Sequence, residues 1–105
     1  VAVTGVQTCA LPICCHGESV TAQFERHLSP ERAKEVLRGA PGVVVEDDPR
    51  TALYPMPING TGKDAVYVGR IRKDTGLDNA ISMWVVSDNL RKGAALNAVQ
   101  IAELF

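Results

Sequence analysis

The segment CCHGES, Cys14 to Ser19, holds the first residues whose types could do chemistry. An imidazole can hold a nearby thiol as its thiolate, which is the basis of a cysteine–histidine catalytic couple. Adjacent residues of a strand point to opposite faces, however, so Cys15 and His16 are poorly placed to act on each other. A zinc site needs about four ligands at recognisable spacings, and no second cysteine and histidine cluster follows. Neither chemistry is complete within this segment, and we expect no metal site.

Other groups of residues have weaker chemical interpretations. The stretch NGTGKD, Asn59 to Asp64, lacks the early glycine and the final hydroxyl residue of a phosphate-binding loop, so we reject that function. Asp47 and Asp48 could hold a metal ion, but a solvated strand end explains them more simply. His27 stands alone and is expected on the surface. Four basic residues could bind an anion, or form salt bridges or a subunit contact: Arg70, Arg72, Arg91 and Lys92.

The elements that must position these residues become readable from residue 19 onward. Residues 19–26 alternate between apolar and polar side chains, which predicts a half-buried strand. Residues 28–42 carry the punctuation of a helix, with Ser29 as a plausible N-cap and Pro30 at the first helical position.

Three further strands and a closing helix are predicted, at residues 43–48, 65–74, 80–88 and 88–105. Between them, residues 49–64 read as an irregular connection, because proline cannot donate to a central ladder. Strict alternation would place Val66, Val68, Arg70 and Arg72 on one face of their strand, opposite Tyr67 and Ile71. The closing helix can be capped by Asp88 or Asn89.

This order of elements predicts an α+β fold, a mostly antiparallel sheet with helices on one side, plus a C-terminal helix. The 105 residues suffice for one small domain. A net charge of −1 without a basic block argues against nucleic acid, and no apolar run approaches the ~20 residues of a membrane span. Three cysteines near one end do not form a disulfide framework, so a reducing, cytoplasmic location is expected.

The first fourteen residues differ from the rest of the chain. VTGVQTCALPI, Val3 to Ile13, matches codon by codon the translation of a widely used short-read sequencing adapter. We therefore interpret residues 1–14 as a non-native artefact, with the natural sequence starting at Cys14 or Cys15. The alternative is a genuine N-terminal strand.

The second half of the chain contains motifs that identify a family, whereas its pattern of apolar residues identifies only a fold class. APGVVVEDDP, DAVYVGRIRKD and MWVVSDNLRKGAALNAVQIAELF resemble the C-terminal part of aspartate-semialdehyde dehydrogenases. HGESV resembles the histidine segment of that family, where serine usually stands in place of Gly17. The resemblance covers about residues 15–105. It implies a partial dimerisation and catalytic domain at 15–88, and a helix at 89–105 that packs on a dinucleotide-binding domain absent from this chain.

The resemblance also implies a reaction. Enzymes of this family interconvert aspartyl phosphate and aspartate semialdehyde with NADP(H) and phosphate, for lysine, threonine and methionine biosynthesis, as a homodimer or homotetramer. His16 matches the catalytic histidine, whose type suits proton transfer near neutral pH. Asn89 in SDNLRKG matches the position where the last helix approaches the nicotinamide cofactor, helped by the positive end of that helix. A simple N-cap is the alternative for Asn89.

Several parts of the family's active site have no match here. The substrate-binding arginine normally stands seven residues before the histidine, where this chain has Cys9. Neither the nucleophilic cysteine motif nor a glycine-rich dinucleotide fingerprint is present. We therefore expect the isolated chain to be inactive as a dehydrogenase, and its exposed C-terminal helix to promote self-association. Two alternatives stay open: a fragment of an N-acetylglutamyl-phosphate-type reductase, or a non-catalytic dimerisation module.

Overall fold

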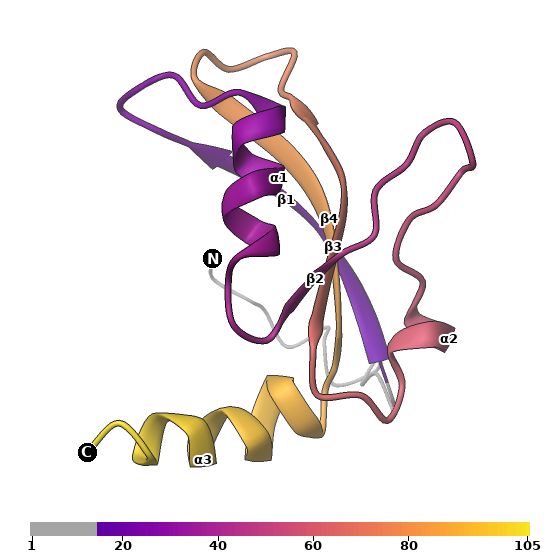
Figure 1. Cartoon of the computed structure of the whole chain (residues 1–105), viewed down its shortest axis with the longest axis vertical. Coiled ribbons are helices and arrows are strands. Elements are labelled where there is room, and N and C mark those ends of the chain that lie inside the picture. The colour runs from indigo at the N-terminus through magenta and orange to yellow at the C-terminus, as the bar shows by residue number, and fades with distance from the viewer. Residues whose placement is uncertain (1–14) are drawn as a thin grey trace, which may run out of the picture.

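The computed structural model describes residues 15–105, which form a four-stranded sheet in the order β1-β4-β3-β2 (Figure 1). The adapter interpretation and the residues Cys9 and Cys14 lie outside this described part. The strands are β1 (Cys15–Gln23), β2 (Val43–Val45), β3 (Val66–Lys73) and β4 (Ala80–Asp88). β4 pairs antiparallel with β1 and β3, whereas β2 runs parallel to β3. The expected α+β class with a mostly antiparallel sheet is confirmed.

Helix α1 (Pro30–Arg38) begins where its capping residues predict. The Ser29 hydroxyl accepts a hydrogen bond from the N–H of Arg32 at 3.2 Å, and Pro30 occupies the first turn. α1 covers one face of the sheet (Figure 1). The buried core of residues 15–105 lies beneath it, formed by Ala33, Val68, Ile71 and Ile81.

The opposite face of the sheet is partly covered by residues 46–65, which connect β2 to β3 and contain the one-turn helix α2 (Pro57–Gly60) (Figure 1). The sequence did not predict this helix. It approaches the sheet closely, since a Cβ on Gly60 would lie 2.9 Å from Cys15 Sγ. The indole of Trp84 in β4 donates to the carbonyl oxygen of Pro55 at 3.0 Å, which fixes the connection to the sheet.

A β-bulge in β3 makes the strict alternation predicted for this strand wrong beyond Gly69. Gly69 pairs with Trp84 and Arg72 pairs with Ser82, so three residue steps on β3 oppose two on β4. Arg70, with φ of 52°, lies in the left-handed region. The extra residue reverses the facing of the later side chains of β3, because side chains alternate with a period of two. Ile71 therefore joins the core beneath α1, and Arg72 lies on the opposite face.

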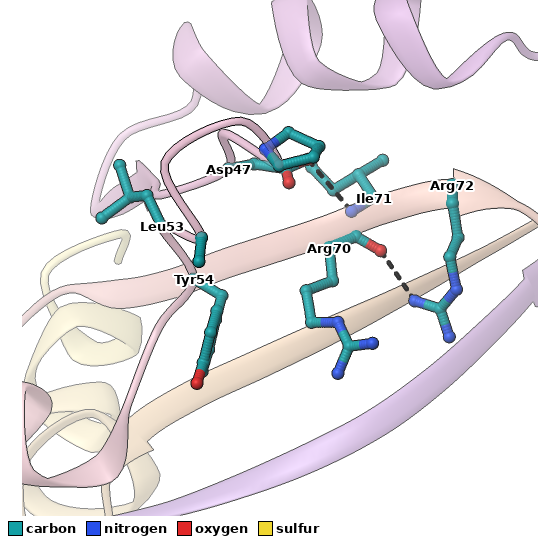
Figure 2. Close-up of a pocket in the computed structure, with 8 residues that line it drawn as sticks. Asp47, Leu53, Tyr54, Arg70, Ile71 and Arg72 are labelled. Carbon is teal, nitrogen blue, oxygen red and sulfur yellow. Dashed lines mark hydrogen bonds between the residues drawn. The ribbon is translucent and has the colours of Figure 1, made fainter.

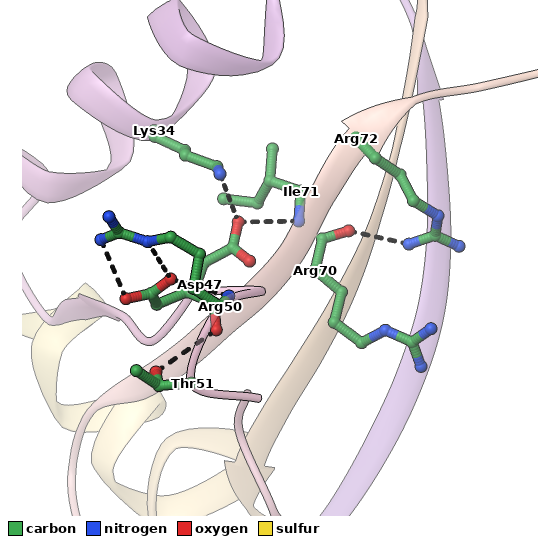
Figure 3. A network of polar contacts seen from close by, with 8 residues as sticks. Lys34, Asp47, Arg50, Thr51, Arg70, Ile71 and Arg72 are labelled. Carbon is green, nitrogen blue, oxygen red and sulfur yellow. Dashed lines mark hydrogen bonds and ion pairs between the residues drawn. The ribbon is translucent and has the colours of Figure 1, made fainter. Parts of the chain in front are cut away.

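The carboxylate of Asp47 holds the bulge to helix α1 (Figure 3). Asp47 Oδ2 accepts from the N–H of Ile71 at 3.1 Å and pairs with the Lys34 ammonium at 2.8 Å. Only 3% of the Asp47 side chain is exposed. Asp48 instead pairs with Arg50, Nε to Oδ1, at 3.2 Å. Both carboxylates thus have structural partners, and within residues 15–105 no three potential ligands gather around a metal position.

The C-terminal helix begins with a π-helical turn, η2 (Arg91–Ala95), and continues as α3 (Leu96–Ala102). It extends away from the sheet (Figure 1). Its large apolar side chains are exposed, as expected: Leu90, Val99, Ile101, Leu104 and Phe105. Among the helices of residues 15–105, none has the length and apolar character needed to cross a membrane.

Candidate functional site

His16 and Asn89 meet at one corner of the sheet, although 73 positions separate them in the sequence. The antiparallel register pairs His16 of β1 with Ser87 near the end of β4, and Asn89 follows that strand directly. The ring nitrogen Nδ1 of His16 contacts Oδ1 of Asn89. The structure therefore brings together the two residues that the sequence singled out separately.

Glu18 completes the polar surroundings of the imidazole. It stands two positions after His16 on the same face of β1, and its Oε1 lies 3.0 Å from His16 Nε2. The Asn89 and Glu18 oxygens are both acceptors, so only the doubly protonated imidazolium donates to both at once. The neutral ring can donate to one of them. Sequence reasoning missed Glu18, although its spacing from His16 on a strand was the signal that could have found it.

Cys15 lies on the other face of β1. Its thiol donates to the carbonyl oxygen of Ser87 at 3.0 Å, and its sulfur lies beside Gly60 of α2. This placement agrees with the expectation that adjacent strand residues diverge. The exposed side chain of His27 also lies where the sequence placed it, on the surface.

Asp88, the last residue of β4, joins three backbone segments around Asn89. Its Oδ1 accepts from the N–H groups of Leu90 and Arg91 at 2.8 and 3.1 Å, so it satisfies donors at the helix start although the N-cap position is Leu90 and not Asp88 or Asn89. Its Oδ2 accepts from the Gly62 N–H at 2.8 Å. The residue is 4% exposed. The Gly62 N–H, followed by those of Leu90 and Arg91, holds the pKa of this carboxyl below its usual value.

The helix start and the preceding loop are joined a second time through a salt bridge. Arg91 Nε donates to Asp64 Oδ1 at 2.5 Å, and this hydrogen bond raises the pKa of Arg91. Lys92 Nζ donates to Asn97 and to Gln100, at 2.8 Å each. Of the alternatives for the four basic residues, the salt bridge is therefore confirmed for Arg91, whereas Lys92 donates to amide oxygens. The negative charge of the Asp88 carboxylate offsets the positive potential at the start of this helix, so the helix dipole attracts a cofactor phosphate less strongly.

Arg70 and Arg72 are arranged differently. Their side chains and that of Tyr54 point to the same side of β3, beside a cavity of about 440 Å³ (Figure 2). Arg72 Nη1 donates to the carbonyl oxygen of Arg70 at 2.7 Å. Neither guanidinium forms an ion pair with an acidic residue among residues 15–105. Both remain available for a contact outside the described chain.

No glycine-rich turn joins a strand to a helix within residues 15–105, which is the feature that brings a backbone close to a pyrophosphate. Asn89 is the position that the resemblance assigns to the cofactor, and its Oδ1 already contacts His16.

Residues 4–92 match the family described as semialdehyde dehydrogenase, dimerisation domain, and the chain belongs to this family. Its relatives include the aspartate-semialdehyde dehydrogenase of Aquifex aeolicus, 60% identical over 89 residues, which are 85% of this chain and 26% of that protein. The enzyme of the same name from Bacillus subtilis is 54% identical over 89 residues, 84% of this chain and 26% of its own length. These matches confirm the resemblance to aspartate-semialdehyde dehydrogenases.

Solved structures agree with the sequence relatives. Aspartate semialdehyde dehydrogenase II from Vibrio cholerae, in a crystal structure described as complexed with ASA, superimposes with a TM-score of 0.79 at 39% identity. The superposition covers 87% of this chain and 26% of that one. The chain thus spans about a quarter of the length of the relatives that it matches.

Proposed function

We propose that the chain is part of an NADP-dependent aspartate-semialdehyde dehydrogenase and supplies the catalytic histidine of that enzyme. The names of the relatives and the contacts of His16 with Asn89 and Glu18 support this proposal. The whole enzyme would interconvert aspartyl phosphate and aspartate semialdehyde in the cytoplasm, for lysine, threonine and methionine biosynthesis. The chain alone would be inactive, since the nucleophilic cysteine and the substrate-binding arginine come from elsewhere.

In this proposal His16 transfers protons. Its neutral imidazole accepts the proton of the nucleophilic thiol as sulfur attacks the aldehyde carbon, and the imidazolium gives that proton to the oxyanion of the adduct. The imidazole then removes the hydroxyl proton of the adduct as its carbon is oxidised to the thioester, and attack of phosphate on the thioester releases the cysteine thiolate. The imidazolium has an acceptor at each ring nitrogen, Asn89 Oδ1 and Glu18 Oε1. The nicotinamide, when bound, accepts the hydride. Asn89 would contact that cofactor while touching the histidine, which places the proton-transfer group close to the hydride acceptor.

A chimeric enzyme tests the proposal directly. Residues 15–105 would replace the matching segment of the Bacillus subtilis relative, and phosphate-dependent NADPH formation from aspartate semialdehyde would be measured. We expect activity, and we expect His16→Ala to lower kcat by about 10²- to 10⁴-fold, the range for a lost acid–base group. His27→Ala is the matched control, because this histidine is exposed and lies beyond the opposite end of β1 from His16, and it should leave kcat unchanged.

Two outcomes would count against the proposal. A folded chimera that is inactive with aspartate semialdehyde but active with the N-acetylglutamyl analogue would assign the chain to the related reductases. A chimera whose kcat is unchanged by His16→Ala would remove the histidine from catalysis and favour a dimerisation module without a catalytic role.

We further propose that a second copy of the chain docks on the sheet face opposite α1. The family is a dimerisation domain, and α1 already covers the other face. The proposed face presents the residue types that dominate interface cores: an aromatic, a methionine and an arginine. These are Tyr54 and Met56, 44% and 41% exposed, and Arg70. The assembly would be a homodimer or a pair of homodimers.

A further inference from the structure

We infer that Asp88 is a positioning residue that fixes the proton of neutral His16 on Nδ1, because it holds Asn89 against the imidazole. The inference rests on the proposed catalytic role of His16 and concerns which of its ring nitrogens acts as the base. Neither the family match nor the sequence pattern assigns Asp88 a part in the site.

The first step of the argument is the anchoring of the backbone on both sides of Asn89. On one side, Asp88 itself pairs with Cys15 in the β1–β4 ladder. On the other side, the Asp88 carboxylate accepts from the N–H groups of Leu90 and Arg91. The main chain of Asn89 is therefore held before and after the residue. Only the side-chain torsions of Asn89 remain to be set, and its Oδ1 reaches His16 without further backbone movement.

The second step is the tie to a distant segment. The third hydrogen bond of Asp88, from the Gly62 N–H, fastens this corner to the loop that follows α2. The salt bridge between Asp64 and Arg91 fastens the same loop to the same helix turn, but on the exposed surface. A buried carboxylate that accepts three N–H bonds is costly to replace, because each donor would lose its partner. Asp88 is accordingly the interior anchor, and Asp64 is the exposed one.

The third step is the choice of tautomer. A neutral imidazole carries one N–H, and the hydrogen bond at one nitrogen decides which nitrogen keeps the proton. Two acceptors compete for that proton, Asn89 Oδ1 at Nδ1 and Glu18 Oε1 at Nε2. The Glu18 side chain is 63% exposed and is solvated by water, whereas Asn89 is held by the anchored backbone on both sides, so Asn89 selects the Nδ1–H form of His16. The lone pair is then on Nε2, on the side of Glu18, where the ring is partly open to solvent. Nε2 becomes the nitrogen that accepts the thiol proton in the proposed reaction.

Nitrogen-15 spectroscopy of the histidine rings tests this inference on the 105-residue chain. The measurement would be made at about pH 8, above the ordinary pKa of imidazole. We expect His16 to show the Nδ1–H tautomer, and the exposed His27 to show averaged signals in the same spectrum. Asp88→Asn keeps an acceptor for the helix N–H groups but loses the acceptor for Gly62. It should move the His16 signals toward the averaged pattern.

Three variants separate positioning from simple stability. Asn89→Ala should allow both tautomers of His16 to interconvert although Asp88 is intact. Asn89→Asp keeps an oxygen acceptor and should retain the Nδ1–H form. Asp64→Asn breaks only the exposed salt bridge and should leave His16 unchanged. Circular dichroism of each variant reports whether the fold is retained.

The inference is overturned if wild-type His16 shows the Nε2–H tautomer or the averaging of His27. It is equally overturned if folded Asp88→Asn keeps the wild-type signals. Should Asp88→Asn fail to fold, amide exchange in the wild type decides: slow exchange at Gly62, Leu90 and Arg91 supports the anchor, and fast exchange refutes it. None of these measurements needs catalysis, so an inactive chimera with a fixed His16 tautomer would count against the proposed function alone.

Discussion

Gly17 of β1 lies beneath the indole of Trp84, so closely that a Cβ on Gly17 would overlap the six-membered part of the ring. The ring cannot simply move aside, because its Nε1 donates to the carbonyl oxygen of Pro55. Gly17 and Trp84 are therefore matched to each other. The serine that the family resemblance led us to expect at this position does not fit under this indole.

Replacing Gly17 with serine should destabilise the chain. We expect the free energy of unfolding in urea to fall by about 1–3 kcal/mol, the usual cost of overpacking. Gly39→Ala is the matched control, because a Cβ there would lie 3.7 Å from the Val36 carbonyl oxygen, an ordinary contact. Trp84→Leu in the same chain should relieve most of the cost of the serine. Equal free energies of unfolding for Gly17→Ser and Gly39→Ala would show that the indole of Trp84 can move aside at little cost.

Removing the carboxylate of Asp47 should weaken the attachment of the bulge to α1. Asp47→Ala leaves the Ile71 N–H and the Lys34 ammonium without their shared acceptor, at a cost of about 1–3 kcal/mol. Thermal unfolding should show the loss, and the exposed neighbour pair offers a control, since Asp48→Asn should change stability little. If both variants melt with the wild type, the Asp47 bonds do not stabilise the bulge.

Acid should destabilise the chain through Asp74 and Asp88. The Ser82 hydroxyl donates to Asp74 at 2.6 Å and, with the N–H groups of Gly76 and Leu77, lowers the pKa of that carboxyl below the ordinary 3.8. A carboxyl with a lowered folded pKa contributes stability above its unfolded pKa, and loses it as pH falls through the folded pKa.

Urea unfolding between about pH 6 and pH 2 should therefore show falling midpoints below about pH 4. Asp74→Asn should be less stable than the wild type at pH 6 and should lose less stability on acidification, because it has no carboxyl to protonate. Asp78→Asn, in the same turn but exposed, is the control. Parallel profiles of stability against pH for the wild type and Asp74→Asn would show that protonation of Asp74 does not cause the loss of stability in acid.

The proposed dimer surface can be tested by reversing one charge on it. Arg70→Glu should weaken self-association by on the order of tenfold or more, as arginines are frequent hot spots of interfaces. Sedimentation equilibrium measures the dissociation constant, and Arg38→Glu, on an exposed position of α1, is the control on the opposite face. An unchanged dissociation constant for Arg70→Glu would show that the dimer interface does not include this face of the sheet.

The exposed C-terminal helix provides a second, separable source of association. Phe105 and Leu104 are 106% and 81% exposed, and Ile101 and Val99 are about half exposed. Phe105→Ser together with Leu104→Ser should reduce light scattering at high concentration without changing the dimer constant, because polar side chains shrink the exposed apolar patch. If these two changes abolish the dimer, the helix and not the sheet face holds the copies together.

The sequence predicted those elements whose ends carry their own signals. Ser29 and Pro30 marked the start of α1, and the strand predicted at residues 80–88 has the bounds of β4. The pairing of β1 with β4 left no such signal, since it depends on contacts between segments far apart. The family resemblance singled out His16 and Asn89 separately, and their contact follows only from the pairing of β1 with β4.

The sequence could not predict the bulge or the short helix α2, for a related reason. An added residue in β3 changes no local propensity, and Arg70 is an unusual residue for a left-handed position. The helix α2 has four residues, two of them proline and glycine, so composition indicated an irregular loop. Glu18 was different: residues two apart on a strand share a face, so its spacing from His16 was a signal that could have identified this carboxylate as a partner of the ring.

The bulge at Arg70 also constrains any alignment or recombination of this strand. Arg70 and Ile71 together oppose the single residue Met83, so deleting Arg70 would restore an uninterrupted ladder and leave Ile71 and Arg72 on their present faces. Deleting any residue of β3 before the bulge would instead reverse the facing of the residues between the deletion and the bulge. When segments of homologous enzymes are exchanged within β3, they should therefore be aligned by the residue that takes the core position of Ile71 and not by counting from Gly69.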